Sequence, residues 1–137
     1  MSDQYIENIL KKVKTIALVG ASEKQERPSY KVMEYLLNQG YCVIPVSPKL
    51  VGKTLLGQMV VGQLSDIGQS VDMVEVFRNA TAAYGVAEET ITIGAKVLWL
   101  QKGVINDEAK LLAENKGLNV VMDRCPKIEI PRLGLEK

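Results

Sequence analysis

TIALVGAS, the stretch from Thr15 to Ser22, decides the fold of this chain. Its first five residues are mostly apolar, as in a strand covered on both faces, and Gly20 lets the backbone turn sharply where the strand ends. Pro28, further along, stands where a helix can start. This order of strand, tight turn and helix predicts the first unit of an α/β protein.

The same alternation of short apolar runs and longer helical patterns continues along the chain. Helices are predicted where apolar residues recur three and four positions apart, at residues 28–39, 82–93 and 106–116, and a glycine suited to a left-handed cap follows each. Another amphipathic helix, at residues 6–13, should pack against the sheet. Besides Thr15–Val19, strands are predicted at Cys42–Val46, Met73–Phe77, Val97–Leu100 and Asn119–Met122.

These elements predict an α/β fold: a Rossmann-like, doubly wound parallel sheet of about five strands in a three-layer α/β/α arrangement. Numbered along the chain, the strands are expected in the order 3-2-1-4-5. Glycines interrupt every pattern between residues 47 and 71, where we expect loops with one short helix or strand. The tail at 126–137 should be irregular or a short docked helix. Residues 1–137 are expected to form one domain.

Composition narrows the functional classes. The 137 residues carry 17 basic and 16 acidic side chains, a formal charge of +1, which is unlike the basic excess of most nucleic-acid binders. No apolar run is long enough to cross a bilayer and no secretion signal begins the chain, so we expect a cytoplasmic protein. Two cysteines predict neither a disulfide framework nor a metal site. The absence of histidine removes every mechanism that depends on imidazole.

Basic side chains follow all five predicted strands, at the edge of the sheet where ligands bind in such folds. A crevice lined by them would attract an anion with several charges, so the ligand should carry phosphates. The alternative is that basic residues simply prefer exposed loops. The five are Arg27, Lys49, Arg78, Lys102 and Arg124.

The loop after the first strand suits a diphosphate, because its residues are small and the N–H groups of the next helix would point toward an anion there. Only the first glycine of the G-x-G-x-x-G fingerprint is present, and a glycine that merely turns the chain would give the same pattern. The residues concerned are Gly20, Ala21, Ser22, Arg27, Pro28 and Ser29.

The end of the second strand distinguishes among adenine cofactors. Proteins that bind NAD commonly place Asp or Glu about 20 residues past the glycine loop, where it holds the ribose 2′-hydroxyl. This strand instead ends in Val46-Ser47-Pro48-Lys49. Ser47 and Lys49 suit a phosphate on the ribose, which indicates coenzyme A with its 3′-phosphate or NADP with its 2′-phosphate. An ordinary exposed turn lysine is the alternative.

Segments along nearly the whole chain carry a family resemblance: IALVGAS with RPSY, VIPVSPK, VDMVEVFRN, LWLQKGVIN and VVMDRCPKIEIPRL. Together they resemble the CoA-binding domain family, specifically its small stand-alone bacterial members, which are similar to the N-terminal domain of succinyl-CoA synthetase alpha subunits. In those ligases a second domain carries a phosphorylated histidine. This chain has no histidine, so that chemistry does not carry over.

The resemblance also implies roles for particular residues. The loop of Gly20, Ala21 and Ser22 would hold the diphosphate of coenzyme A, and Ser47-Pro48-Lys49 would lie beside its adenosine. Further residues would border the ligand, the last two of them near the pantetheine arm: Phe77, Arg78, Gln101, Lys102, Gly103, Arg124 and Cys125.

The two cysteines are expected to differ. Cys42, inside an apolar strand, should belong to the core. Cys125 has two interpretations: a buried structural residue, which we favour, or a reactive thiol beside the thiol end of coenzyme A, with Arg124 favouring its thiolate.

The sequence therefore predicts a protein that binds coenzyme A or an acyl-CoA without catalysis, acting alone or as a module for an unidentified protein partner. One alternative is an NADP-dependent oxidoreductase with Tyr30 or Lys102 as the proton donor. Another is the detached CoA-binding subunit of an acyl-CoA ligase whose histidine lies on a different chain.

Overall fold

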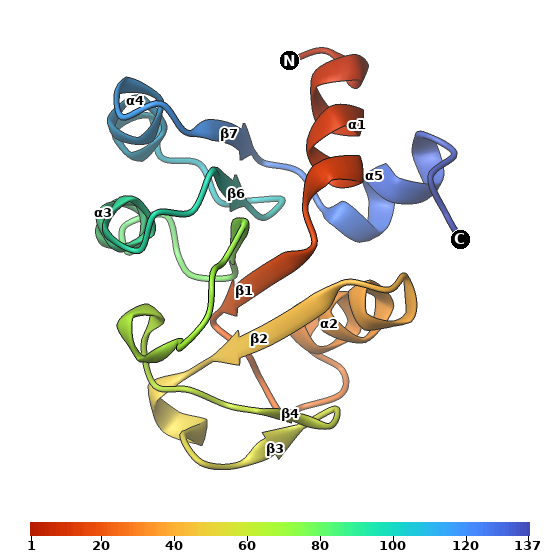
Figure 1. Ribbon diagram of the computed structural model, residues 1–137, viewed down its shortest axis with the longest axis vertical. Coiled ribbons are helices and arrows are strands. Elements are labelled where there is room, and N and C mark those ends of the chain that lie inside the picture. The colour runs from red at the N-terminus through yellow and green to blue at the C-terminus, as the bar shows by residue number, and fades with distance from the viewer.

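Five parallel strands form the central sheet in the computed structural model, which describes residues 1–137 (Figure 1). Every pairing within this sheet is parallel. The prediction was right for all five strands, apart from Phe77, which follows the third strand instead of ending it. Their bounds are β1 Thr15–Val19, β2 Cys42–Val46, β5 Met73–Val76, β6 Val97–Leu100 and β7 Asn119–Met122.

The fold class is confirmed, but the expected strand order is wrong in one place. The sheet has the order β2-β1-β5-β6-β7, so the third of the five strands lies beside the first, on the side opposite the second. The outer edge of β2 is already occupied, because Val61 N donates to Pro45 O at 3.1 Å and Ser47 N donates to Val61 O at 2.9 Å. The chain then crosses to the free edge of β1. The order 2-1-3-4-5 is the other common doubly wound arrangement.

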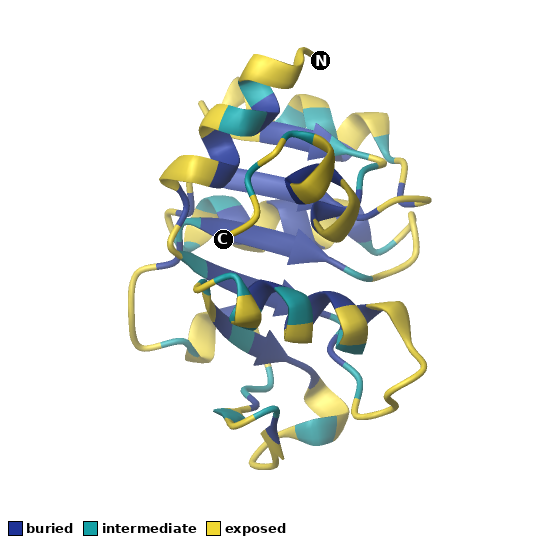
Figure 2. Cartoon of the chain, turned by 90° about the vertical axis from the view of Figure 1, so that its right-hand side faces the viewer, coloured by how far each residue is buried: buried dark blue, intermediate teal, exposed yellow.

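Helices cover both faces of the sheet, as Figure 2 shows for the buried strands between them. One face packs on α1 (Asp3–Lys12), α2 (Pro28–Asn38) and α5 (Pro126–Arg132), and the other on α3 (Ala83–Thr92) and α4 (Asp107–Asn115). Alternation along each strand divides the buried side chains into two clusters, one on each face. None of the helices combines the length and the apolar character needed to span a bilayer.

The sequence signals at the helix ends are confirmed. Pro28 is the first residue of α2, and the Asn106 side chain caps α4 by accepting from Ala109 N at 2.9 Å. Positive φ angles, +94°, +80° and +86°, end α2, α3 and α4 at Gly40, Gly94 and Gly117.

The N-terminal helix packs against the sheet, as predicted. Ile6, Ile9 and Leu10 are buried in the same cluster as the strand residues of that face. Tyr5 also closes the outer edge of β7, because its hydroxyl accepts from Val120 N at 2.8 Å and donates to Val120 O at 3.0 Å.

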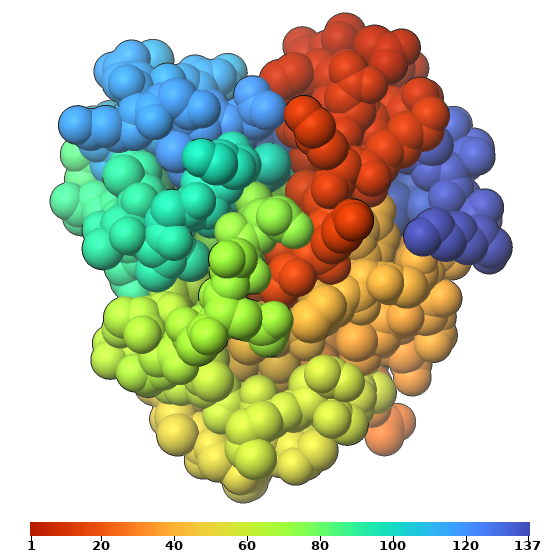
Figure 3. Space-filling view, in the orientation of Figure 1, coloured from red at the N-terminus to blue at the C-terminus, as the bar shows by residue number.

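The segment between β2 and β5 is more ordered than predicted. It forms one-turn 3₁₀ helices at Pro48–Leu50 and Leu64–Asp66 and an antiparallel hairpin of β3 (Thr54–Leu55) and β4 (Gln58–Met59). Figure 3 shows this segment, in yellow to yellow-green, at the lower end of the molecule. Buried apolar residues spread along it explain why the glycine-rich pattern still folds.

Cys42 is exposed, so its assignment to the core is wrong. It begins the edge strand β2, and its neighbour Val43 takes the position facing α2. Cys42 therefore points to the face of α3 and α4. Those helices make their main contacts with β5, β6 and β7, at a distance from this corner of the sheet.

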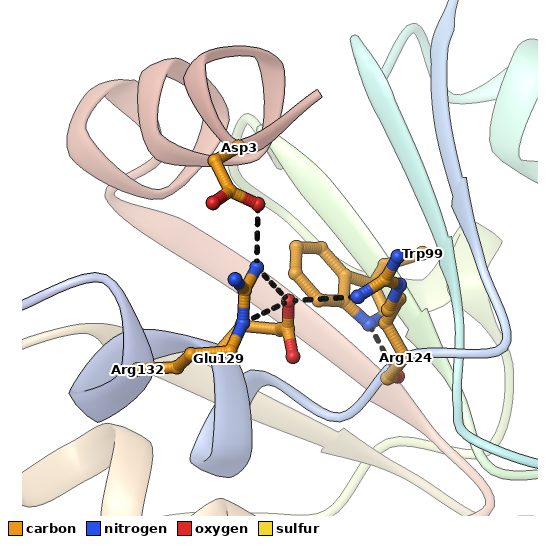
Figure 4. Close-up of polar contacts among 5 residues, drawn as sticks. All are labelled: Asp3, Trp99, Arg124, Glu129 and Arg132. Carbon is orange, nitrogen blue, oxygen red and sulfur yellow. Dashed lines mark hydrogen bonds and ion pairs between the residues drawn. The ribbon is translucent and has the colours of Figure 1, made fainter. Parts of the chain in front are cut away.

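A buried carboxylate anchors α5, which forms the docked C-terminal helix allowed by the sequence. The Glu129 side chain is 4% exposed, and it accepts from Arg132 at 2.7 and 3.2 Å and from Arg124 at 3.3 Å (Figure 4). Arg132 also contacts Asp3 of α1 at 2.9 Å, and these contacts raise the pKa of its guanidinium. Trp99 Nε1 donates to Arg124 O at 2.8 Å. The network joins α1, α5 and β6.

Replacing Glu129 by leucine should lower the free energy of unfolding by about 2 kcal/mol, because two guanidiniums lose their shared acceptor while remaining partly in water. Urea unfolding measures the loss. The control is Glu7→Gln, which breaks the exposed pair of Glu7 with Lys11 and should cost less than about 0.5 kcal/mol. Equal losses would contradict the anchoring role of Glu129.

Candidate functional site

The reversal of strand order opens a crevice between β1 and β5. The chain leaves β1 for α2 on one face and leaves β5 for α3 on the other, so the two loops diverge at the carboxyl ends of these strands. A cavity of about 760 Å³ lies there. Six of its lining residues were predicted as site residues: Gly20, Ala21, Ser47, Pro48, Lys49 and Arg78.

A second cavity, of about 270 Å³, borders the start of α2. Gly20, just after the end of β1, lines both cavities. All six residues that line the smaller one were predicted as site residues: Gly20, Ser22, Arg27, Pro28, Ser29 and Phe77.

The other five predicted residues line neither cavity. Gln101 is buried, Lys102 is exposed, and Gly103 N donates to Asp123 Oδ1 at 2.7 Å. The Arg124 guanidinium turns to Glu129, and Cys125 is 7% exposed. The burial of Cys125 supports the structural interpretation of this thiol, and Arg124 forms its ion pair elsewhere.

Gly20 is required by packing. Its φ is +92°, and a Cβ atom at this position would lie 2.2 Å from the carbonyl oxygen of Phe77. The N–H groups of Gly20 and Ala21 both donate to Val46 O, at 3.0 and 3.2 Å, so they are already engaged. The N–H of Ser22 makes no hydrogen bond within the protein. Among the residues that line the smaller cavity, Ser22 and Ser29 are therefore the ones whose backbone N–H groups can donate to an anion.

The charges around the larger cavity are mixed. Lys49 and Arg78, two of the predicted site residues, line it, but so do Asp66 and Glu89, which the sequence reasoning missed. Asp66 comes from the poorly predicted segment before β5, and Glu89 lies on α3. No local signal connects either residue with the loop after β2. Of the three cations in the two cavities, only Arg27 lies in the smaller one, which lacks a carboxylate.

Glu75 is a further residue that the sequence reasoning missed. It occupies the middle of the sheet in β5, between Leu18 and Trp99 of the neighbouring strands, and is completely buried. Both carboxyl oxygens lack a hydrogen-bond partner. Burial first, and nearby Cys125 second, raise the pKa of Glu75 well above its usual value. A single glutamate inside the apolar run Met73–Phe77 was the available signal.

A parallel doubly wound sheet with a cavity at the reversal of strand order defines a Rossmann-like domain of the kind that binds nucleotide cofactors. The chain belongs to the CoA-binding domain family, whose model matches residues 14–131.

Three known proteins illustrate the similarity. The uncharacterized protein YneT of Bacillus subtilis is 39% identical over 123 residues, which cover 90% of each chain. A hypothetical protein from Pyrococcus horikoshii has a solved structure with a TM-score of 0.92 and 40% identity, and the match covers 97% of this chain and 92% of that one. A Thermus thermophilus structure has a TM-score of 0.92 and 37% identity, with coverage of 97% and 99%.

Replacing Gly20 by alanine should lower the free energy of unfolding by more than about 2 kcal/mol, because the methyl group meets the backbone of Phe77 in addition to the strain of a positive φ. Gly94→Ala is the matched control, since φ is +80° there and no atom lies within 4 Å of the added Cβ. The control should lose only about 1–2 kcal/mol. Thermal unfolding compares them, and equal losses would contradict the close contact.

Glu75 should make stability fall as pH rises. The native state keeps a proton that the unfolded state releases above its usual pKa of 4.5, so each pH unit from there to the raised pKa costs about 1.4 kcal/mol. Glu75→Gln removes this slope. In urea unfolding, the free energy of unfolding of the variant should rise relative to that of the wild type as pH increases from 5 to 8. A constant difference over this range would mean that Glu75 does not titrate abnormally.

Proposed function

We propose that this protein binds coenzyme A or an acyl-CoA in the crevice between β1 and β5. The supporting observation is the pair of cavities that both border Gly20 and are lined by Lys49, Arg78 and Arg27, in a chain of the CoA-binding domain family. A ligand that carries both a diphosphate and a ribose phosphate needs cations at two positions. Arg27 lines the smaller cavity, and Lys49 and Arg78 line the larger one.

In the proposed complex the diphosphate lies at the smaller cavity. Arg27 would face the phosphates, and Ser22 would donate its free N–H, with Ser29 at the start of α2. The packing of Gly20 on Phe77 would keep this position open. Ala21 and Pro28 would supply small, rigid walls.

The adenosine end lies in the larger cavity under this proposal. Ser47, Pro48 and Lys49 follow β2 there, and Arg78, in the loop after β5, lines the same cavity. A unit charge pair at about 4 Å with an effective dielectric near 20 is worth about 4 kcal/mol before desolvation. Asp66 and Glu89 in the same cavity would disfavour an anion elsewhere in it, and so restrict the ribose phosphate to the Lys49 side.

The far end of the ligand would extend toward the loops after β6 and β7. Gln101, Lys102 and Gly103 would border it, and Arg124 and Cys125 would lie beside the pantetheine arm. The hydrogen bond from Gly103 N to Asp123 joins these two loops. We propose binding without a catalytic step, because the chain has no histidine and its most perturbed carboxyl, Glu75, lies outside both cavities.

Lys49→Ala tests the position of the ribose phosphate. The substitution should weaken the binding of coenzyme A about tenfold. Dephospho-coenzyme A, which lacks the 3′-phosphate, should bind the variant and the wild type with equal affinity. Isothermal titration calorimetry measures both. Lys53→Ala is the matched control, since Lys53 is an exposed lysine paired with Glu23 at 3.4 Å. Equal losses for the two ligands would contradict the role of Lys49.

The same calorimetry on the wild type, with coenzyme A, acetyl-CoA, NADP and NAD, tests the ligand itself. We expect the two CoA compounds to bind and the nicotinamide cofactors not to. If NADP bound and coenzyme A did not, the proposed function would be overturned.

A further inference from the structure

A further cavity lies at the opposite edge of the sheet, where the strands begin, and we call it the amino-edge cavity. Its volume is about 680 Å³, which is ample for a small molecule. Residues at the starts of β6 and β7 form one wall, and α1 forms the other (Figure 1). This cavity shares no lining residue with the two cavities of the crevice. The family model begins at residue 14, so α1 precedes the matched segment.

Backbone hydrogen bonds fix the sheet side of the amino-edge cavity. Lys96 N donates to Asp72 O at 3.1 Å, and Asn119 N donates to Lys96 O at 2.9 Å. The ladder of the sheet therefore extends beyond the starts of β5 and β6, and it holds three lining residues in neighbouring segments of the chain. Lys96 occupies the middle segment of this wall.

The helix side contributes apolar surface. Tyr5 holds α1 against the sheet, because its hydroxyl both donates to Val120 O and accepts from Val120 N. Ile9 and Val13 at the end of α1, and Val97 at the start of β6, are buried in the core and line the cavity. A hydrocarbon group in the cavity would leave water for contact with these three side chains, which is favourable.

Two lysines without a partner also line the cavity. Lys12, in the last turn of α1, and Lys96 are exposed and form no ion pair within the protein. The one carboxylate in the lining, Asp72, is already engaged, because its Oδ2 accepts from Lys14 N and Thr15 N, each at 2.9 Å. The charges available to a ligand are therefore positive.

Two carboxamides add hydrogen-bond donors beside the lysines. Asn8 Oδ1 accepts from Gln4 Nε2 at 2.7 Å, which leaves the Nδ2 group of Asn8 to donate to a ligand. Asn119 lines the cavity with a second, exposed amide. Amide and ammonium donors suit the oxygens of a carboxylate, which can accept several hydrogen bonds at once.

We propose that the amino-edge cavity binds a small amphipathic carboxylic acid, with its carboxylate beside the two lysines and its hydrocarbon group against the buried apolar residues. The lysines disfavour a cationic ligand, and the apolar lining disfavours an anion without a hydrocarbon group. This inference goes beyond the proposed function, because the cavity lies at the edge of the sheet opposite the crevice. It holds whether or not coenzyme A binds.

NMR titration of the protein with hexanoate, hexanol and hexylammonium separates the contribution of charge from that of the hydrocarbon. Hexanoate should bind about tenfold more tightly than hexanol, since two exposed ion pairs contribute modestly, and hexylammonium should bind more weakly than either. Shortening the acid to butanoate should weaken binding by about fourfold for each methylene that leaves the cavity. Equal affinity for hexanoate and hexanol would overturn the proposal.

Lysine variants test the position of the carboxylate. Lys12→Ala and Lys96→Ala should each weaken hexanoate about threefold, and the double variant about tenfold, while the affinity for hexanol stays unchanged. Lys31→Ala is the matched control, because Lys31 is an exposed lysine of α2 that lines none of these cavities. It removes the same charge and should bind hexanoate like the wild type. An equal loss in Lys31→Ala and Lys96→Ala would show attraction by net charge alone and would overturn the site.

The same spectra locate the ligand. Hexanoate should shift the amide signals of Lys96, Val97 and Asn119 and leave those of Ser22 and Arg27 in place, with or without coenzyme A in the sample. Shifts confined to Ser22 and Arg27 would place the acid in the crevice and overturn the proposal. A tripeptide that ends in leucine tests the other source of such a carboxylate. Tighter binding of the peptide than of hexanoate would overturn the assignment to a free acid.

Discussion

The contact of Gly20 with the carbonyl of Phe77 is the constraint on which the arrangement of the crevice depends. Only a residue without a side chain can bring the end of β1 this close to the end of β5. Phe77 N donates to Val19 O at 2.8 Å, and the N–H groups of Gly20 and Ala21 donate to Val46 O, so β2, β1 and β5 are joined at their carboxyl ends. The loops must diverge from this junction, and both cavities begin there. The glycine thus acts on the ligand site through the backbone that it brings together.

Local patterns predicted the elements well because each depends on a few neighbouring residues. Pro28, Asn106 and the capping glycines define helix ends by chemistry within one turn, and apolar runs define strands that are buried on both faces. Strand order depends instead on long-range competition for a sheet edge. Val61 pairs with the outer edge of β2, and the residues around Val61 in the sequence do not predict this pairing. The exposure of Cys42 has a similar origin, because coverage of a strand depends on where distant helices pack.

The residues of the candidate site likewise fall into two groups, those that local sequence patterns predict and those that depend on tertiary packing. Residues directly after β1, β2 and β5 could be predicted as neighbours, because carboxyl ends of parallel strands meet at one edge. Asp66 and Glu89 reach the cavity from a 3₁₀ turn and from a helix, whose positions no local pattern gives. Glu75 was different, since a lone acid in an apolar strand is visible in the sequence. Only its complete burial without a partner shows that it is exceptional.

The charges of the site change along its length, and this change bears on the choice of ligand. The larger cavity has cations and carboxylates, whereas the smaller one has Arg27 without a carboxylate. Under the proposed function, the diphosphate therefore belongs at the smaller cavity, where no carboxylate opposes its charge. The ribose phosphate belongs beside Lys49 in the larger cavity, and the uncharged adenine ring is the part of the ligand that tolerates Asp66 and Glu89.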